Sequence, residues 1–284
     1  MRPGRPAGAS LFPLTAMPIP ADRPLVMGIV NVTPDSFSDG GRYLDHAAAL
    51  DHAGALVAAG AAILDLGGES TRPGSLPVPV EAELARVLPV LQAVHDLGVP
   101  VSVDTMKPAV MRAAVAAGAA MINDVYGFRA EGAWEAVRDS DCALCIMHMQ
   151  GEPRSMQVAP RYDDVVAEVE AFLADRIAAA EAAGIARARL WIDPGFGFGK
   201  SLEHNLALLR ALPRLARLAP VLAGLSRKRM IGALTGREVP ADRVAGSVAA
   251  ALRAVENGAG IVRVHDVAET VDALKVWLAS AGRA

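Results

Sequence analysis

Polar and ionisable residues of this chain follow the ends of short apolar runs. Side chains at such positions can come together around a substrate. The stretch 193–200, Asp-Pro-Gly-Phe-Gly-Phe-Gly-Lys, follows the apolar run Leu190–Ile192 with a carboxylate, three alternating glycines and two aromatic rings. Glycine lets a ligand approach the backbone closely. The stretch therefore predicts a flat pocket with an aromatic wall. The plainer alternative is an ordinary glycine-rich loop after a strand.

Seven other apolar runs end in the same way. An aspartate or asparagine at one such position could cap the following helix, but capping does not explain polar residues after every run. We therefore expect these residues to form one site. The polar segments are Asn31–Gly41, Gly67–Gly74, Asp104–Thr105, Asn123–Asp124, His148–Gly151, Ser226–Lys228 and Arg263–Asp266.

One group of these residues is cationic and polar, and it indicates an anion site. Arginine binds phosphate through two parallel N–H groups, and histidine can add a further donor. Arg263 and His265 are two residues apart, so on a strand both face the same side. The group predicts a site for phosphate or diphosphate. Its members are Asn31, Arg72, Arg263 and His265.

A second group mixes hydrogen-bond donors and acceptors. A carboxylate accepts, a lysine donates and an asparagine does both, which suits the edge of a flat, nitrogen-rich heterocycle. Met147 and Phe198 could supply the apolar faces. Both groups together predict a heterocyclic substrate with an anionic leaving group. The members of the second group are Asp104, Asn123, Asp193 and Lys228.

Eight apolar runs alternate with eight helical patterns, and these elements must position the polar residues. The runs are nearly continuous, which is typical of parallel strands covered by helices. Eight such units predict an α/β fold, a single-domain (β/α)₈ TIM barrel whose active site lies in the loops after the strands; a doubly wound open sheet is the competing topology. Strands are expected at 25–30, 62–66, 100–103, 120–122, 143–147, 190–192, 221–223 and 260–264. Helices are expected at 46–59, 80–97, 107–117, 131–138, 162–183, 202–218, 242–257 and 267–280.

Composition narrows the class of protein. The 284 residues are 52% apolar but only 4% aromatic, so the core must be aliphatic. A net charge of -3 argues against nucleic acid as a partner, and no apolar run has the length of a membrane span. Residues 1–24 are expected to be a disordered extension without the apolar core of a signal peptide, and residues 25–284 the barrel domain. A cytoplasmic location follows from this interpretation.

Two cysteines, Cys142 and Cys145, have the C-x-x-C spacing of some metal and redox sites. They fall on an expected strand, where residues three apart point to opposite faces. The sequence therefore predicts two buried, reduced thiols.

Eight motifs, in order from about residue 25 to the C-terminus, resemble those of the dihydropteroate synthases, the bacterial type within the pterin-binding family. The matching segments follow the expected strands, and no motif position departs from the family pattern. The segments are 31–41 (NVTPDSFSDGG), 67–74 (GGESTRPG), 102–105 (SVDT), 122–125 (INDV), 147–151 (MHMQG), 193–200 (DPGFGFGK), 226–228 (SRK) and 263–266 (RVHD).

The resemblance implies a (β/α)₈ barrel that joins p-aminobenzoate to 6-hydroxymethyl-7,8-dihydropterin diphosphate, giving 7,8-dihydropteroate and diphosphate. It implies a homodimer with Mg²⁺ as cofactor and Asn31 as a metal ligand. Catalytic roles fall to Asp104, Lys228, Asp35 and Arg263. The pterin would meet Asp104, Asn123, Met147, Asp193 and Lys228; the diphosphate would meet Asn31, Arg72, Arg263 and His265; and p-aminobenzoate would meet Thr71, Pro73, Phe198 and Ser226.

Two other functions compete with the synthase. A methyltetrahydrofolate-type methyltransferase domain shares such a barrel and pterin pocket, but it needs neither the anion site nor the loop at 33–39. A non-catalytic pterin-binding relative would carry a damaged Asn31 loop or anion site, and both are intact here. Because an arylamine is uncharged at neutral pH, no dedicated general base is expected. His148 and Asp124 are expected to give structural support.

Overall fold

Eight parallel strands close into a barrel in which each strand pairs with the next and β8 pairs with β1. The computed structural model describes residues 24–32, 42–71, 74–151, 156 and 160–282. Closure between the last strand and the first confirms the predicted TIM barrel and excludes the open sheet. The strands are β1 (Leu25–Asn31), β2 (Ile63–Gly67), β3 (Val101–Asp104), β4 (Met121–Asp124), β5 (Ala143–Met147), β6 (Leu190–Asp193), β7 (Val221–Ala223) and β8 (Ala259–Val264).

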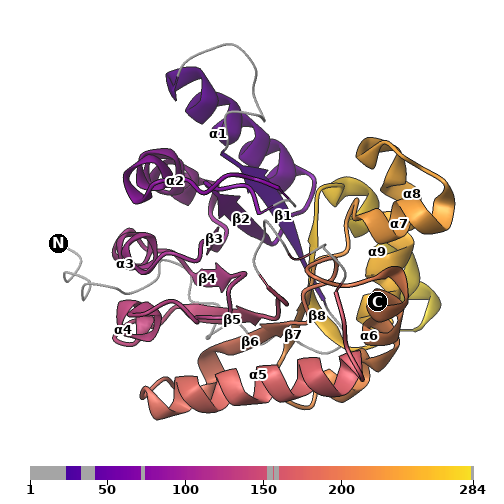
Figure 1. Ribbon diagram of the computed structural model, residues 1–284. Helices are drawn as coiled ribbons and strands as arrows, with labels where there is room; N and C mark the ends of the chain where they lie inside the picture. Colours follow the sequence, from indigo (N-terminus) through magenta and orange to yellow (C-terminus); the bar gives the residue numbers. More distant parts are fainter. Residues whose placement is uncertain (1–23, 33–41, 72–73, 152–155, 157–159, 283–284) are drawn as a thin grey trace.

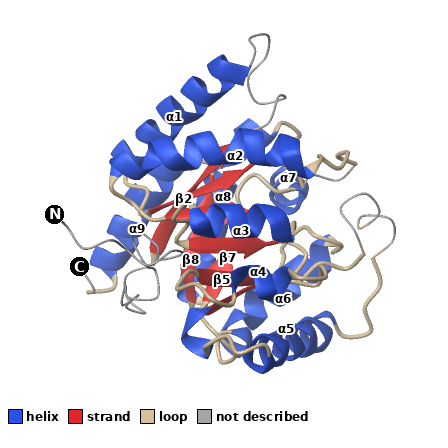
Figure 2. Cartoon of the chain, turned by 90° about the vertical axis from the view of Figure 1, so that its left-hand side faces the viewer, coloured by secondary structure: helices blue, strands red, loops and turns tan. Residues whose placement is uncertain are grey.

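Helices surround the strands, which lie at the centre of the molecule (Figures 1 and 2). Each predicted helix is present, with ends within a few residues of the expected ones. The short α7, between β7 and α8, was not expected. None of the described helices is long and apolar enough to cross a membrane. The helices are α1 (Arg42–Ala58), α2 (Val80–Val94), α3 (Pro108–Ala116), α4 (Ala133–Val137), α5 (Val165–Ala182), α6 (Leu202–Leu215), α7 (Arg229–Thr235), α8 (Val244–Glu256) and α9 (Val267–Ser280).

Glycines with positive φ end several of these helical segments. Such a conformation is open to glycine and costly for residues that carry a Cβ. The glycines at 60, 98, 118, 184 and 258 all have φ between 74° and 99°. The sequence therefore marks where these helices stop.

Side chains that point into the barrel change from apolar at its base to polar at its mouth. The base is a cluster that includes Met27, Ile63, Trp191 and Ile261. Alternate residues of a strand share a face, so the next inward residues along the same strands include Asp65, Asp193 and Arg263. A larger aliphatic cluster lies between the strands and the helices. The polar side chains named here therefore lie at the mouth of the barrel.

The two cysteines take opposite sides of the barrel wall, as their spacing predicts. Cys142 belongs to the outer cluster and Cys145 to the inner one. Both are buried free thiols, and burial raises the pKa of each.

The junction between β6 and β7 is the least regular part of the barrel. These strands register at a single pair, Ile192 opposite Val221. The next junction, between β7 and β8, contains a register shift at Val221 and Leu222.

Candidate active site

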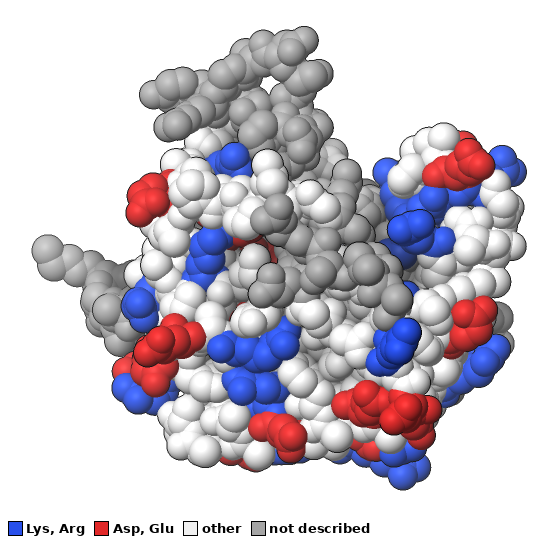
Figure 3. Space-filling view, in the orientation of Figure 1, with Lys and Arg blue, Asp and Glu red and all other residues white. Residues whose placement is uncertain are grey.

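Two glycines at the mouth of the barrel mark where the predicted side chains converge. A methyl group placed on Gly67 would lie 3.9 Å from both Asn31 Oδ1 and Asp104 Cβ. One placed on Gly224 would lie 3.8 Å from Lys228 Nζ and 3.9 Å from Asp193 Oδ2. Glycine keeps both places open. Figure 3 shows a hollow in this view, with acidic side chains visible in its depth.

Arg263 lies between two buried carboxylates. Its Nε donates to Asp65 Oδ2 at 2.5 Å, and its Nη2 donates to Asp104 Oδ2 at 3.0 Å. One positive charge thus faces two acidic groups. Burial raises the pKa of Asp104 to about 8, against the opposing effect of Arg263 and with a contribution from Asp65. Two of the five guanidinium N–H donors are engaged here, so donors remain for a ligand.

Asn123 stands beside Asp104, its register partner on the neighbouring strand. Its Oδ1 is buried and has no hydrogen-bond partner among the described residues. A buried acceptor without a partner is costly. A substrate donor at this position would satisfy it.

Asp193 uses one carboxylate oxygen to accept from the backbone N–H of Gly195, at 2.7 Å. This contact is the turn-capping bond that an aspartate after a strand can form. Each carboxylate oxygen has two lone pairs, so the group keeps capacity for a substrate. Burial raises the pKa of Asp193, and Lys228 opposes that shift.

Lys228 connects the polar edge of the site with its aromatic wall. Its Nζ donates to the carbonyl of Phe196 and lies 4.7 Å from the ring centre of Phe198. Burial lowers the pKa of Lys228 to about 8, while Asp193 opposes the shift. Met147 and Phe198 belong to one small apolar cluster. The structure thus brings the predicted apolar faces next to the mixed donor and acceptor set.

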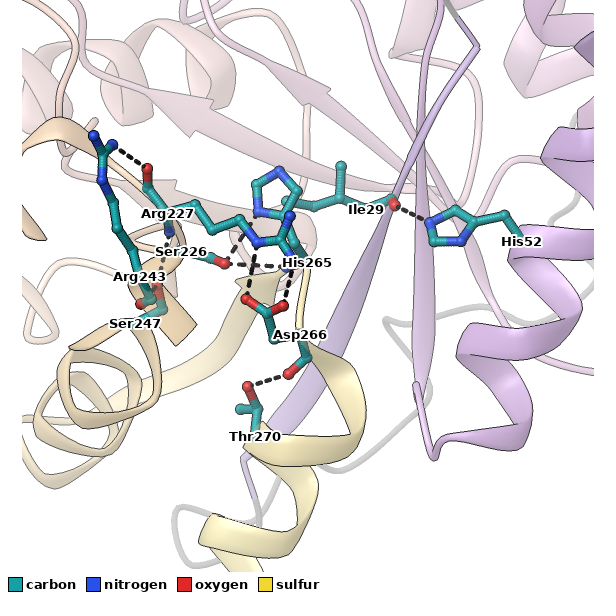
Figure 4. Close-up of polar contacts among 9 residues, drawn as sticks. All are labelled: Ile29, His52, Ser226, Arg227, Arg243, Ser247, His265, Asp266 and Thr270. Carbon is teal, nitrogen blue, oxygen red and sulfur yellow. Dashed lines mark hydrogen bonds and ion pairs between the residues drawn. The ribbon is translucent and has the colours of Figure 1, made fainter. Parts of the chain in front are cut away.

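His265 and Ser226 meet at the β8 side of the mouth (Figure 4). The Ser226 hydroxyl accepts from the His265 backbone N–H at 3.1 Å and lies 3.0 Å from its Nδ1. Beside them the Arg227 guanidinium donates twice to Asp266, with Nε at 3.1 Å from Oδ2. Arg227 has φ 57°. This ion pair holds a residue of unfavourable backbone conformation between Ser226 and Lys228.

A buried ion-pair cluster lies under the loop that carries Thr71. Lys107 Nζ donates to Glu69 and, at 2.5 Å, to Glu83, whose side chain is fully buried. Glu69 also accepts from the backbone N–H of Val78 at 3.1 Å. The cluster ties both ends of this loop to the barrel. The predicted site residues Asp35, Arg72 and Pro73 lie outside the described residues.

Several residues around the site escaped the sequence interpretation. Asp65 is a charged residue inside an apolar strand, and that contrast is the signal that could have revealed it. Lys107 and Lys200 carry no such signal, because their partners lie far away in the sequence. His148 and Asp124 are buried supports, as expected: Asp124 accepts from two backbone N–H groups at 2.7 Å.

The arrangement can hold a flat heterocycle at one side and an anion at the other. Among the described residues, no three histidine, cysteine, aspartate or glutamate side chains are grouped so as to hold a metal ion.

Comparisons with known proteins show which family this chain resembles. Residues 27–265 match the family model described as pterin binding enzyme. The dihydropteroate synthase of Neisseria meningitidis serogroup B is 55% identical over 263 residues, which cover 90% of this chain and 92% of that protein.

Two solved structures are similar to this chain in fold as well as in sequence. The Xanthomonas albilineans dihydropteroate synthase with 4-aminobenzoic acid has a TM-score of 0.87 and 62% identity, over 92% of this chain and 94% of that one. The Burkholderia cenocepacia dihydropteroate synthase complexed with 7,8-dihydropteroate has a TM-score of 0.84 and 56% identity, over 92% of each chain.

Proposed function

Because this chain belongs to the dihydropteroate synthase family of pterin-binding enzymes, we propose that it joins p-aminobenzoate to 6-hydroxymethyl-7,8-dihydropterin diphosphate. The arylamine nitrogen attacks the methylene carbon of the pterin. The bond from that carbon to the diphosphate oxygen breaks, and diphosphate leaves with the electron pair. The nitrogen then loses a proton, and 7,8-dihydropteroate is the product.

The unpartnered Oδ1 of Asn123 is the observation that carries this proposal. It lies in a set that also contains Asp104, Asp193 and Lys228, whose donors and acceptors complement the edge of a pterin. Met147 provides an apolar contact for the ring. A buried acceptor without a partner inside this set supports a substrate that brings its own N–H groups.

The remaining residues take roles around the reacting bond. Arg263 and His265 would bind the diphosphate, together with Arg72. In its ionised form, Asp104 would favour positive charge that develops on the pterin as the bond breaks, with Asp35 assisting. The p-aminobenzoate would lie against Phe198, near Ser226, Thr71 and Pro73. No general base is required, because the attacking amine is already neutral.

The donor set fits Mg²⁺ as cofactor. Magnesium prefers oxygen ligands, keeps several waters and is commonly bound by one or two protein groups plus substrate phosphates. The Asn31 amide oxygen, close to Gly67 at the mouth, would be the protein ligand. When bound, the ion supplies charge neutralisation to the departing diphosphate.

The deciding experiment mixes the purified chain with both substrates and Mg²⁺ and measures diphosphate and dihydropteroate together. We expect the two products in equal amounts, with diphosphate release depending on p-aminobenzoate. Pterin binding without turnover would point to the non-catalytic relative. Methyl transfer from methyltetrahydrofolate to a corrinoid would point to the methyltransferase.

We also propose a cytoplasmic homodimer. Apolar side chains exposed at Leu234 and Val239, in and beside α7, support a contact between two copies. The two buried free thiols are consistent with a reducing compartment. Light scattering on the purified chain tests the dimer, and a monomer at micromolar concentration would contradict it.

A further inference from the structure

Lys200, the last residue of the glycine-rich stretch, places a buried amino group behind the proposed site. The residue is 4% exposed. Its Nζ lies 2.9 Å from His148 Nδ1, 3.0 Å from the carbonyl oxygen of Phe198 and 3.4 Å from that of His148. When the amino group is protonated, its three N–H donors match these three acceptors in number. Lys200 therefore connects the loop after β6 to the loop after β5.

His148 is suited to accept this bond. Burial lowers its pKa to about 2, and Lys200 adds to the shift, so the imidazole is neutral. Its ring packs edge-on against Phe172, with ring centres 4.9 Å apart. A neutral imidazole with Nδ1 as acceptor carries its proton on Nε2. The ring is thus a fixed anchor for Lys200.

The glycines of the stretch allow the loop after β6 to pack closely against the loop after β5. Gly195 has φ 70°, and a methyl group there would come within 1.9 Å of the His148 carbonyl oxygen. A methyl group on Gly199 would come within 2.8 Å of the Gln150 carbonyl oxygen. Lys200 Nζ lies 3.4 Å from the carbonyl oxygen of His148, a residue that is 6% exposed, and a buried acceptor without a donor is costly.

The segment held in this way carries the aromatic wall of the site. Phe198 is the residue whose carbonyl oxygen Lys200 binds, and its ring lies 4.7 Å from Lys228 Nζ. Other contacts also hold the same segment: Lys228 Nζ donates to the Phe196 carbonyl, Asn205 Oδ1 accepts from the Gly197 N–H at 2.7 Å, and Tyr162 donates to the Gly199 carbonyl at 2.9 Å. Without Lys200 the segment would keep these contacts, but the Phe198 carbonyl oxygen would lose its donor.

We propose that Lys200 is a positioning residue for the arylamine, holding the Phe198 ring in place through its carbonyl group. The inference rests on the proposed function. It predicts selectivity between the substrates, because three of the four polar residues proposed for the pterin, Asp104, Asn123 and Asp193, lie on strands, whereas Phe198 lies on the loop that Lys200 contacts. Loss of Lys200 should therefore affect the arylamine much more than the pterin.

The test compares Lys200→Met with Arg189→Met in the full chain. Arg189 is also a buried cation that donates to backbone carbonyls, including Cys142 O at 2.9 Å, but it lies just before β6, at the other end of the strand. For Lys200→Met we expect the KM for p-aminobenzoate to rise about tenfold or more, the size of one buried acceptor left without its donor. The KM for the pterin diphosphate and its calorimetric Kd should change less than about threefold.

Arg189→Met should lower Tm without changing the ratio of the two KM values. Equal changes in both KM values for Lys200→Met, or no change, would overturn the positioning role. A wild-type chain that releases no diphosphate would instead refute the proposed function, so the two failures are distinguishable.

A second pair of variants decides the matter if Lys200→Met does not fold. In His148→Asn the amide oxygen can occupy the position of Nδ1 and keep an acceptor for Lys200, whereas His148→Ala removes it; both lose the ring. We expect the KM for p-aminobenzoate to be at least about threefold higher in His148→Ala than in His148→Asn. Equal values would overturn the role.

Discussion

Asp65 lies directly behind Arg263 and accepts from its Nε at 2.5 Å, although the two residues are 198 positions apart in the sequence. Asp65 is fully buried on β2, while the arginine reaches towards the mouth. The carboxylate therefore fixes the guanidinium plane and leaves the outer N–H groups to face a ligand. The negative charge of Asp65 also raises the pKa of Asp104.

Asp65→Asn should move the pH dependence of the reaction. Removal of a negative charge next to Asp104 lowers the pKa of that carboxyl, so Asp104 would remain ionised at lower pH. The limb of the kcat/KM profile that reports its ionisation should move to lower pH. The control is Ser102→Ala, an uncharged change at the register partner of Asp65. A profile that does not move, with Ser102→Ala behaving like wild type, would contradict the coupling.

Asp193→Asn should weaken pterin binding while the fold persists. Asparagine can still accept from the Gly195 N–H, but its NH₂ group would face a pterin donor and leave it unsatisfied. Such a loss costs about 1–3 kcal/mol, or roughly ten- to a few hundred-fold in Kd. Calorimetry and a melting curve on the same variant measure both effects, with the exposed Asp139→Asn as control. A lower Tm with normal pterin affinity would reduce Asp193 to a turn cap.

Lys107→Met should destabilise the chain far more than the same change at an exposed lysine. It would leave Glu83, which is fully buried, without its cation. We expect a loss of roughly 2–4 kcal/mol in urea unfolding, a little below the range for fully buried pairs. Lys275→Met breaks a pair whose side chains are 72% and 76% exposed, and should cost less than about 1 kcal/mol. Similar losses in the two variants would show that the Lys107 cluster contributes little.

Lys200 should make the stability of the chain depend on pH in the alkaline range. Burial lowers its pKa from 10.5 to about 7, with Asp193 opposing the shift and Lys228 adding to it; His148, the third titratable neighbour, is neutral. Between these two values the unfolded chain binds more protons at this position than the folded chain. The stability of wild type relative to Lys200→Met should therefore rise with pH from about 7 to 10.5.

The size of this effect is at most about 1.4 kcal/mol per pH unit. Urea unfolding of both proteins at several pH values measures it. A difference that stays constant, or that falls as pH rises, would mean that Lys200 keeps its proton in the folded state throughout.

Local patterns in the sequence were sufficient to predict the barrel. The apolar runs fall on the strands, and the polar residue after each run lies at the mouth because parallel strands end on the same side. Glycines such as Gly60 and Gly118 mark helix ends through a backbone conformation that other residues avoid. Each of these signals is contained within a few consecutive residues.

Residues that act across the barrel could not be predicted in this way. Lys107 gives no local sign that it pairs with Glu83, and Lys200 gives none that it reaches His148. α7 was missed because seven residues, Arg229–Thr235, are too few to show a helical period. The missing information was the pairing of distant segments, which only the closed barrel supplies.

The single register pair between β6 and β7 has a mechanical consequence. Asp193 ends β6, while Lys228 lies beyond β7, so the proposed pterin residues stand on either side of the least-paired junction of the barrel wall. A pterin held by both would act as a cross-link over that junction. Its binding should slow hydrogen exchange of the β7 amides even where the ligand makes no contact, because it would tie together the two neighbouring strands that register at only one pair.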